Sequence, residues 1–221
     1  MRLRCLGSGS SGNCYLLEND AECLVIEQGI PMKEVKIALD FNISKIVGGI
    51  QSHSHKDHSA YAGEFEKCGI EIWRPNESGY KTRKFGGFKI QAFPLVHDVP
   101  CYGFVIWHHD CGPIVFATDT EYIPVTFRGI KPETLMVECS YQTEYLPEGN
   151  IKNDRQYLTH MECETTRRCV LANQTPSLRH VVLLHLSFAA CNDKEVTEAV
   201  KNDLNGTVGV YTAYKGMSIE L

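Results

Sequence analysis

The chain has 221 residues, a mass of 24.9 kDa and 43% hydrophobic residues, which suits one domain with a substantial buried core. We therefore predict a single domain over residues 1–221, with two small domains as the alternative. The formal net charge of −5 argues against bulk electrostatic adhesion to nucleic acid, although a local basic patch could exist. We see neither a signal-peptide pattern nor a membrane-spanning stretch, so we expect a cytoplasmic protein with no membrane partner.

The order of predicted elements indicates a layered α/β (α+β) fold. Apolar β-type runs predict strands at residues 3–6, 14–17, 23–27, 45–50, 70–73, 88–95, 102–108, 113–118, 135–138 and 180–184. Helical spacing of apolar residues predicts helices at 31–40, 163–173 and 193–204. Strands first, followed by alternating helix and strand, predict sheets covered by helices.

Ten cysteines are scattered along the chain, and no CxxC pair occurs among them. Most follow or lie inside apolar runs, where cysteine packs as a small hydrophobic side chain. We therefore interpret them as reduced core thiols, in agreement with a cytosolic location, and not as zinc-finger ligands.

The segment after the first predicted strand matches GxGxxG at Gly7, Gly9 and Gly12. A dinucleotide site needs a helix directly after the third glycine, because the helix N-terminus holds the pyrophosphate. The strand-like run after Asn13 leaves no room for that helix. We predict a tight hairpin loop instead, whose serine hydroxyls and backbone N–H groups could face the mouth of a site.

The strongest chemical signal is HSHKDH at residues 53–58, directly after the predicted strand 45–50. His53 and His55 in an extended segment point to the same side and can chelate one ion. Asp57 and His58 follow where the chain turns into a helical stretch, and they can face a second ion. Imidazole and carboxylate ligands together suit zinc, with manganese or iron as possible substitutes. The alternative is a solvated polar loop.

Three further predicted strands end in ligand-type residues. The strand at 88–95 leads to His97, the run at 114–117 leads to Asp119, and the strand at 181–184 leads to His185. One such residue would mean little, because polar residues often end strands. Three of them, added to the histidine cluster, predict ligands gathered along one edge of a layered sheet structure.

These residues resemble the five-motif pattern of the metallo-β-lactamase fold hydrolases. HSHKDH, His97, ATDT with Asp119 and LLHLS with His185 follow that pattern in order and spacing over nearly the whole chain. The SGSSGN start at residues 8–13 resembles the small exonuclease-like and phosphodiesterase branch. Ser52 stands where that branch usually has threonine, and Glu121 replaces the glycine of ATDTG, which changes the rim but removes no ligand.

The resemblance implies a four-layer αββα sandwich and two divalent metal ions, zinc first and manganese second. By the resemblance, His53, His55 and His97 hold one ion, and Asp119 bridges to the other. Asp57, His58 and His185 hold that second ion. An aspartate at the bridging position resembles the phosphodiesterase and glyoxalase branches and not the antibiotic-degrading lactamases.

The predicted reaction is hydrolysis of a phosphodiester by a metal-bridged hydroxide, since a two-metal site clamps both attacking and leaving oxygens. His160 resembles the non-ligand histidine that contacts the phosphate and protonates the leaving group in ribonuclease Z-type and exonuclease-type members. Glu138 resembles a carboxylate close to that histidine. We therefore name Asp57, His160 and Glu138 as catalytic candidates, against a helix-capping role for His160 and a local ion pair for Glu138.

Other polar residues give weaker signals. We expect His108, His109 and His180 at the surface. Phosphate binding competes with an ordinary solvated helix face for a set of four basic residues: Arg155, Arg167, Arg168 and Lys194. Ser187 and Asn192, close after His185, are candidates for a substrate rim.

The expected substrate is a nucleic-acid end or a small or cyclic nucleotide. About 40 residues separate Asp119 from His160, too few for the large inserted domain of the long-chain ribonucleases in this superfamily. A thioester or lactone hydrolase of glyoxalase type is the alternative enzyme, because it shares the seven ligands. A metal-stabilised structural module is the non-enzymatic alternative. Relatives commonly form dimers, so a homodimer is the first expectation for assembly.

Overall fold

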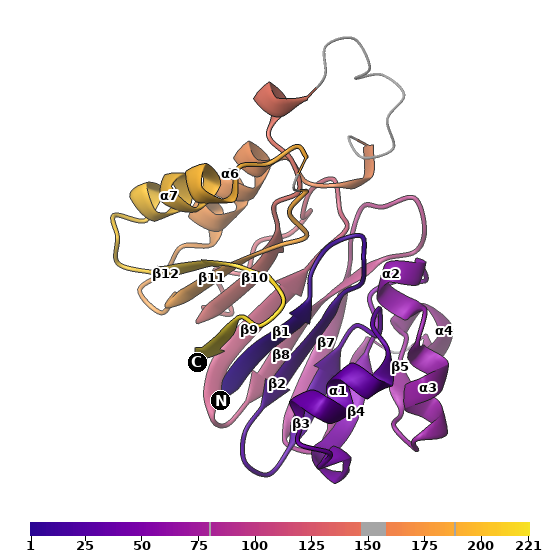
Figure 1. The fold of residues 1–221 in the computed structure, drawn as a ribbon. Helices are drawn as coiled ribbons and strands as arrows, with labels where there is room; N and C mark the ends of the chain where they lie inside the picture. The colour runs from indigo at the N-terminus through magenta and orange to yellow at the C-terminus, as the bar shows by residue number, and fades with distance from the viewer. Residues whose placement is uncertain (80, 147–157, 188) are drawn as a thin grey trace.

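Two mixed β-sheets pack face to face and carry helices on their outer faces in the computed structural model, which describes residues 1–79, 81–146, 158–187 and 189–221 (Figure 1). The chain runs through most of the first sheet before it enters the second. The first and last strands, β1 and β13, pair with each other, so the two ends of the chain lie side by side. The four-layer αββα sandwich predicted from the sequence is confirmed.

The first sheet has six strands in the order β13-β1-β2-β3-β4-β5. Their bounds are β1 Arg2–Gly7, β2 Cys14–Glu18, β3 Cys23–Ile26, β4 Ile46–Ile50, β5 Ile72–Trp73 and β13 Ser218–Glu220. β1 and β2 form an antiparallel hairpin, whereas β3, β4 and β5 run parallel. The GxGxxG segment is the loop of that hairpin, as predicted, and no helix follows it.

The second sheet has seven strands in the order β12-β11-β10-β9-β8-β7-β6. Their bounds are β6 Thr82–Phe85, β7 Phe88–Pro94, β8 Tyr102–His108, β9 Cys111–Ala117, β10 Thr134–Glu138, β11 His180–Leu184 and β12 Gly209–Thr212. β6 to β9 form an antiparallel meander, and β9 to β12 run parallel. Parallel neighbours need crossover connections, and helices supply two of them here.

The helices form the outer layers. α6 Cys163–Asn173 and α7 Asp193–Asp203 cover the second sheet, and four shorter helices lie beside the first: α1 Met32–Ala38, α2 Lys56–Ser59, α3 Ala62–Lys67 and α4 Pro75–Ser78. Single-turn 3₁₀ helices occur at Ile43–Lys45 and Thr143–Tyr145. Glu162 caps α6 and Asn192 caps α7, each accepting hydrogen bonds from backbone N–H groups of the first turn.

Apolar side chains fill three interfaces between the layers. The central one lies between the two sheets and includes Leu17, Phe88, Phe104 and Phe116, all fully buried. A second cluster packs α6 and α7 on the second sheet, and a third packs α1 and α3 on the first. β3 and β10 are covered on both faces and are buried along their whole length. That explains why they read as continuous apolar runs in the sequence.

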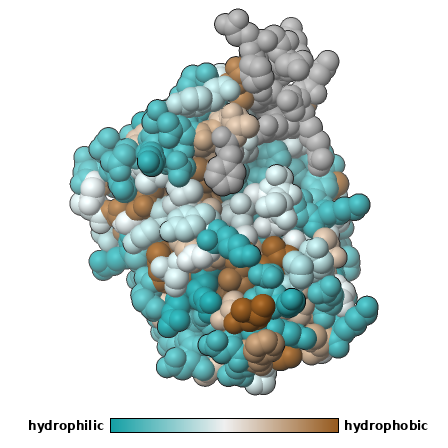
Figure 2. Space-filling model, in the orientation of Figure 1, coloured by the Kyte–Doolittle hydropathy of each residue, from teal (hydrophilic) through white to brown (hydrophobic). Residues whose placement is uncertain are grey.

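The outer surface is different in character. Hydrophilic residues dominate the face shown in Figure 2, and apolar residues form only small separate patches there. Among the described residues, no helix is both long enough and apolar enough to cross a membrane.

All ten cysteines are free, and six of them are buried, in agreement with the interpretation as core thiols.

The sequence analysis missed some elements and misplaced a few ends. β6, β12, β13 and α4 were not predicted, because each is short or polar on one side, and α2 and α3 were expected only as a helical stretch without bounds after His55. The strand predicted at 70–73 is reduced to β5, and the one predicted at 23–27 ends before Glu27.

Candidate active site

The candidate site lies at one edge of the sandwich, where several strands end. His53 and His55 follow β4, Asp119 follows β9, and His185 follows β11. The carboxyl ends of parallel strands meet at the same edge of a sheet, so residues far apart in the sequence converge there. His97, after β7, reaches the same place. The prediction that these strand-end residues gather along one edge agrees with this arrangement.

Three residues at these strand ends have left-handed backbone conformations that are rare outside glycine. The φ angles are 63° at Glu27, 52° at Asp119 and 55° at His185. Such backbone strain costs on the order of 1–3 kcal/mol per residue and persists only where the surroundings enforce it. All three residues direct side chains into the polar cluster, so the strain coincides with the site.

The first group of side chains consists of His53, His55, His97 and Asp119, whose nearest ligand atoms all lie within 4.8 Å of one another. His55 Nδ1 lies 3.0 Å from His53 Nε2 and 3.1 Å from His97 Nε2. Asp119 Oδ2 lies 3.8 Å from His53 Nε2. Three ring nitrogens and one carboxylate oxygen therefore face a common point.

The second group consists of Asp57, His58, His185 and again Asp119, within the same 4.8 Å limit. His58 Nε2 lies 3.2 Å from Asp57 Oδ2 and 3.2 Å from Asp119 Oδ1. His185 Nε2 lies 3.4 Å from Asp57 Oδ2. Asp119 thus offers Oδ2 to the first group and Oδ1 to the second.

The donor chemistry of both groups fits a pair of divalent cations. Neighbouring imidazole nitrogens can share at most one proton between them, so a set of facing nitrogens cannot all be satisfied by hydrogen bonds within the set. A cation satisfies them together, and histidine nitrogen with carboxylate oxygen is a ligand set of zinc and related metals. The two groups share one carboxylate and match a dinuclear site.

Outer partners hold several of these rings in place. Ser52 Oγ lies 2.8 Å from His53 Nδ1, and the carbonyl oxygen of Thr159 lies 2.9 Å from His97 Nδ1. Glu27 is fully buried, accepts from the backbone N–H of Ser52 and lies 3.5 Å from His58 Nδ1. That nitrogen has no hydrogen bond of good geometry among the described residues, so its attraction to Glu27 is electrostatic.

These partners were missed as functional residues. Glu27 was noticed only as the acidic residue of a possible dinucleotide motif, and its place at the end of the strand 23–27 was the available signal. Asp98 was also missed, although it follows His97 directly; its Oδ1 lies 3.3 Å from His55 Nε2 and 3.2 Å from His97 Nε2.

Burial and mutual contact set the charges of the cluster. Burial lowers the pKa of the His53 imidazole to about 2, and the nearby His58 adds to the effect. Burial would raise the pKa of Asp119, but His185 and His58 outweigh it and hold that pKa well below its usual range. Burial opposes the charged form of His185, yet Asp119 and Asp57 raise its pKa to about 9. The carboxylates are therefore anionic, and cation binding at His185 would release a proton.

His160 and Glu138 form a close pair beside the second group. His160 Nδ1 lies 2.6 Å from Glu138 Oε1 and 4.0 Å from Asp119 Oδ2. Burial lowers the pKa of His160, but the hydrogen bond to Glu138 outweighs burial and raises it above its ordinary value. Glu138 is fully buried and also accepts from the backbone N–H of Thr120. Glu138 therefore contacts the His160 ring through Nδ1.

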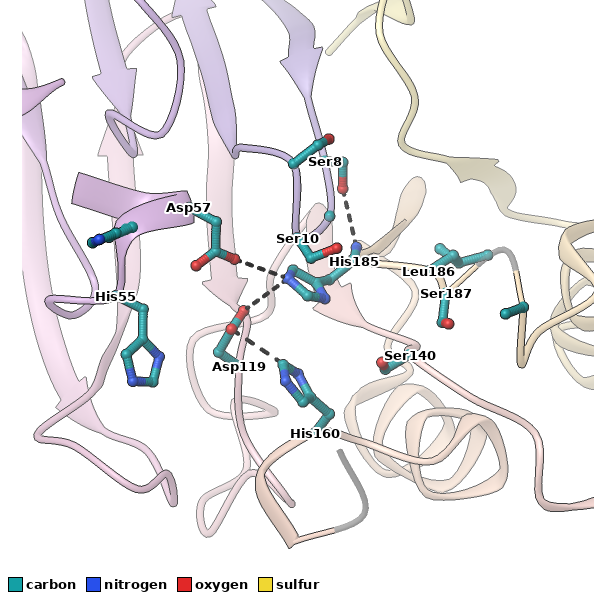
Figure 3. Close-up of a pocket in the computed structure, with 14 residues that line it drawn as sticks. Ser8, Ser10, His55, Asp57, Asp119, Ser140, His160, His185, Leu186 and Ser187 are labelled. Carbon is teal, nitrogen blue, oxygen red and sulfur yellow. Dashed lines mark hydrogen bonds and ion pairs between the residues drawn. The ribbon is translucent and has the colours of Figure 1, made fainter. Parts of the chain in front are cut away.

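A cavity of about 810 Å³ opens over the cluster. Its lining includes His55, Asp57, Asp119, His160 and His185, and the close-up shows Asp57, Asp119 and His160 arranged around His185 (Figure 3). The hairpin loop contributes Ser8, Ser10 and Ser11, and Ser140 and Ser187 complete the polar wall. The expectation that the SGSSGN hydroxyls face the mouth of a site agrees with this lining.

The remaining predictions, on surface histidines and rim residues, agree with the structure in some cases and not in others. His108 is not a surface residue: it is buried, with Nε2 2.9 Å from Glu22 Oε1, because the β8–β9 turn contacts the β2–β3 turn. His109 is exposed and His180 is half-buried at the start of β11. Asn192 caps α7 and does not line the cavity, whereas Ser187 does.

Three of the four basic residues proposed for phosphate binding, Arg167, Arg168 and Lys194, do not line the cavity. Arg167 is paired with Asp203 and Glu164, and Arg168 with Glu164, as expected for a solvated helix face. Arg155 lies outside the described residues.

Comparison with solved structures identifies the fold class of the protein. Over its whole length the chain superposes on the metallo-β-lactamase fold protein YhfI of Bacillus subtilis, with a TM-score of 0.78, 18% identity and 99% of that chain covered. It also matches the short form of human tRNase Z (TM-score 0.65, 14% identity, 99% of that chain) and unliganded yeast PDE1 (0.70, 12%, 99%). The chain has the metallo-β-lactamase fold, which confirms the resemblance drawn from its motifs.

Sequence comparison finds relatives that are named exodeoxyribonucleases. The chain is 21% identical to exodeoxyribonuclease YycJ of Bacillus anthracis over 217 residues, covering 83% of this chain and 81% of the relative. It is 24% identical to exodeoxyribonuclease WalJ of Streptococcus pneumoniae over 218 residues, covering 82% and 80%. No family model matches the sequence. The prediction of a metal-dependent hydrolase of the phosphodiesterase or nuclease type agrees with these comparisons.

Proposed function

We propose that this protein is a dinuclear metal-dependent phosphodiesterase that removes nucleotides from DNA ends. One observation carries the proposal: two groups of metal-ligating side chains share Asp119 and open into one cavity beside the His160–Glu138 pair. The relatives named as exodeoxyribonucleases support DNA as the substrate over a small or cyclic nucleotide.

The ligand assignment follows the two groups. His53, His55 and His97 would hold one cation, Asp57, His58 and His185 the other, and Asp119 would contact both. Two divalent cations there would supply positive charge for the phosphodiester oxygens and lower the pKa of a water nucleophile. Phosphoryl transfer depends mainly on such charge neutralisation and positioning, so a protein nucleophile is not needed. Asp57 therefore acts as a metal ligand that helps to arrange the second group of side chains, and not as an attacking nucleophile.

His160 is the proton donor of the proposal. Glu138 holds Nδ1 of the ring and stabilises its protonated form, so Nε2 can donate a proton to the departing alkoxide. The same positive charge attracts a phosphate oxygen before the reaction. The serine hydroxyls of the hairpin loop and of Ser140 line the cavity and can position the remaining phosphate oxygens.

A substrate panel tests the proposal. Purified protein is assayed on single- and double-stranded DNA with labelled ends, RNA, cyclic mononucleotides and a glutathione thioester, with and without chelator. We expect release of mononucleotides from DNA ends, lost on chelation and restored by zinc or manganese. Hydrolysis of the thioester alone would overturn the proposal in favour of a glyoxalase-type enzyme. Fewer than one equivalent of bound metal in the folded protein would overturn the dinuclear assignment.

The variant His160→Ala separates the two enzyme classes within the same site. Loss of the proton donor should lower kcat on DNA about 10²–10⁴-fold while leaving the metal content at two equivalents. His109→Ala is the matched control, because His109 is exposed and distant from the cavity lining. Unchanged kcat for His160→Ala on every phosphodiester would reject the role given to His160.

Three finer points belong to the proposal. We infer zinc as the resident metal from the histidine-rich ligand set. We also infer a homodimer, which sedimentation at several protein concentrations would test. The ten free cysteines support a cytoplasmic location, since a reducing compartment keeps thiols unpaired.

A further inference from the structure

A second cavity lies directly beside the first. Its volume is about 700 Å³, and its lining shares Ser8, Ser11 and Leu186 with the cavity over the metal-ligating cluster. The partition between the two is the β1–β2 hairpin loop together with Leu186. The outer wall comes from the start of α1 and from the connection between β12 and β13, which approach that loop in the fold (Figure 1).

Glycines allow the backbone of this loop to pack closely on itself and on the segment before α1. A Cβ atom on Gly7 would lie 2.4 Å from the carbonyl oxygen of Gly12, and one on Gly12 would lie 2.4 Å from that of Gly29. Gly12 also has a φ of 138°, which favours glycine. Because Ser8, Ser11 and Leu186 line both cavities, one ligand can place different parts on the two sides of this loop.

The second cavity has a different chemistry from the first. Leu6, Ile30, Pro31 and Ala213 give it apolar walls, and the ring of Tyr214, 60% exposed, borders it. This lining is suited to a flat, uncharged group that can stack on an aromatic ring.

The charged groups on the lining point to the same kind of ligand. They are the carboxylates Glu34 and Asp193 and a single lysine, Lys215, whose Nζ is already paired with Glu34 Oε2 at 3.2 Å. A phosphate would meet two carboxylates and one neutralised cation there, so it is disfavoured. A nucleobase instead offers N–H groups that carboxylates accept.

We propose that the second cavity binds the nucleobase next to the scissile phosphodiester, with the base stacked on Tyr214 and its N–H edge toward Asp193 or Glu34. This inference rests on the proposed phosphodiesterase function and adds the base as a recognised part of the substrate. Stacking tolerates every base, which suits an enzyme that degrades DNA of any sequence from its end.

Two chromogenic phosphodiesters with the same leaving group test the proposal. Thymidine 5′-(p-nitrophenyl phosphate) carries a base, and methyl p-nitrophenyl phosphate does not. For the wild type we expect a lower KM for the thymidine ester. Tyr214→Ala should shrink the ratio of the two KM values by about 5- to 150-fold, the range of base–aromatic stacking, whereas Tyr214→Phe should retain the ratio. Free adenosine should compete with the thymidine ester in the wild type and not in Tyr214→Ala.

Phe41→Ala is the matched control, because Phe41 is 72% exposed and lies outside both cavity linings. An unchanged KM ratio in Tyr214→Ala would overturn the base site while leaving the phosphodiesterase proposal intact. A loss of dimer in Tyr214→Ala would also overturn it, because a second copy would then cover the cavity. Failure of the wild type to hydrolyse either ester would instead count against the proposed function.

Discussion

In the part of the chain that the structure describes, two places gather buried histidine with carboxylates, and they differ in what the ring nitrogens face. At the β8–β9 turn, His108 has Nε2 on Glu22 and accepts from the backbone N–H of Asp110 through Nδ1. Both of its nitrogens therefore have a partner. In the candidate active site, the nitrogens of His53, His55 and His97 face one another. A structural histidine satisfies each nitrogen with a fixed partner, whereas histidines placed to bind an ion direct several nitrogens to one point.

The largest effect should come from the residue that joins the two groups. Asp119→Asn removes a charge from both proposed metal positions, so kcat/KM on DNA should fall about a thousandfold or more, since the metals supply several kcal/mol to the transition state. Bound metal, measured by elemental analysis, should fall below two equivalents. If Asp119→Asn kept both metals and wild-type kcat/KM, the metal-binding role that distinguishes the histidines around Asp119 from His108 would be contradicted.

Metal removal should lower stability as well as activity. Metal binds the folded chain in preference to the unfolded one, and a saturated tight site adds about 3–4 kcal/mol. For a chain of this size, chelation should then lower Tm by roughly 6–16 °C in calorimetry. His108→Ala should show the same downward shift on chelation, because His108 lies outside the proposed site. An unchanged Tm after confirmed metal loss would argue against the ligand assignment.

Glu27→Gln tests the outer support of the site. The change keeps an acceptor for the backbone N–H of Ser52 but removes the charge that faces His58 Nδ1. Metal affinity should fall about 10–100-fold, the range typical for partners behind ligand histidines. Competition with a chromogenic chelator measures this change. Glu22→Gln, which alters the partner of His108, serves as its counterpart and should leave metal affinity unchanged.

His108→Ala should differ from the variants of the candidate active site, because it should lower stability and leave metal binding and activity unchanged. It removes the partner of Glu22 Oε1 at the β8–β9 turn, which should cost about 1–3 kcal/mol in the free energy of unfolding. Activity on DNA and metal content should stay at the wild-type level. A fall in kcat without a fall in stability would contradict the purely structural role given to His108.

The smallest effect concerns pH and the ion pairs of Glu18. Burial would raise the pKa of Glu18, but the hydrogen bonds from Lys45 and Arg4 outweigh it and lower the pKa. A lowered folded pKa contributes stability that is full above the unfolded value and is lost as pH falls through the folded value. The stability difference between the wild type and Glu18→Gln should therefore narrow below about pH 4.5 in urea unfolding. A difference that is constant from pH 6 to pH 3 would contradict the paired state of Glu18.

Much of the architecture could be predicted from local pattern. β3, β10 and β11 are covered by other elements and read as unbroken apolar runs, and α6 agrees with the predicted helix at both ends. β13 was missed because three residues carry too little pattern to separate strand from loop. β13 depends on pairing with β1, more than 200 residues earlier in the chain.

The sequence by itself determined the ligand types and their places at the ends of strands, because alternating and continuous apolar runs locate those ends. It did not show how the surroundings of His108 differ from those of His53, because it placed His108 at the surface. Only the tertiary structure decided that difference, because the partner of a ring nitrogen comes from a remote segment. The same holds for Glu27 behind His58 and for the second cavity. Long-range packing brings those groups together, and no local pattern encodes their distances.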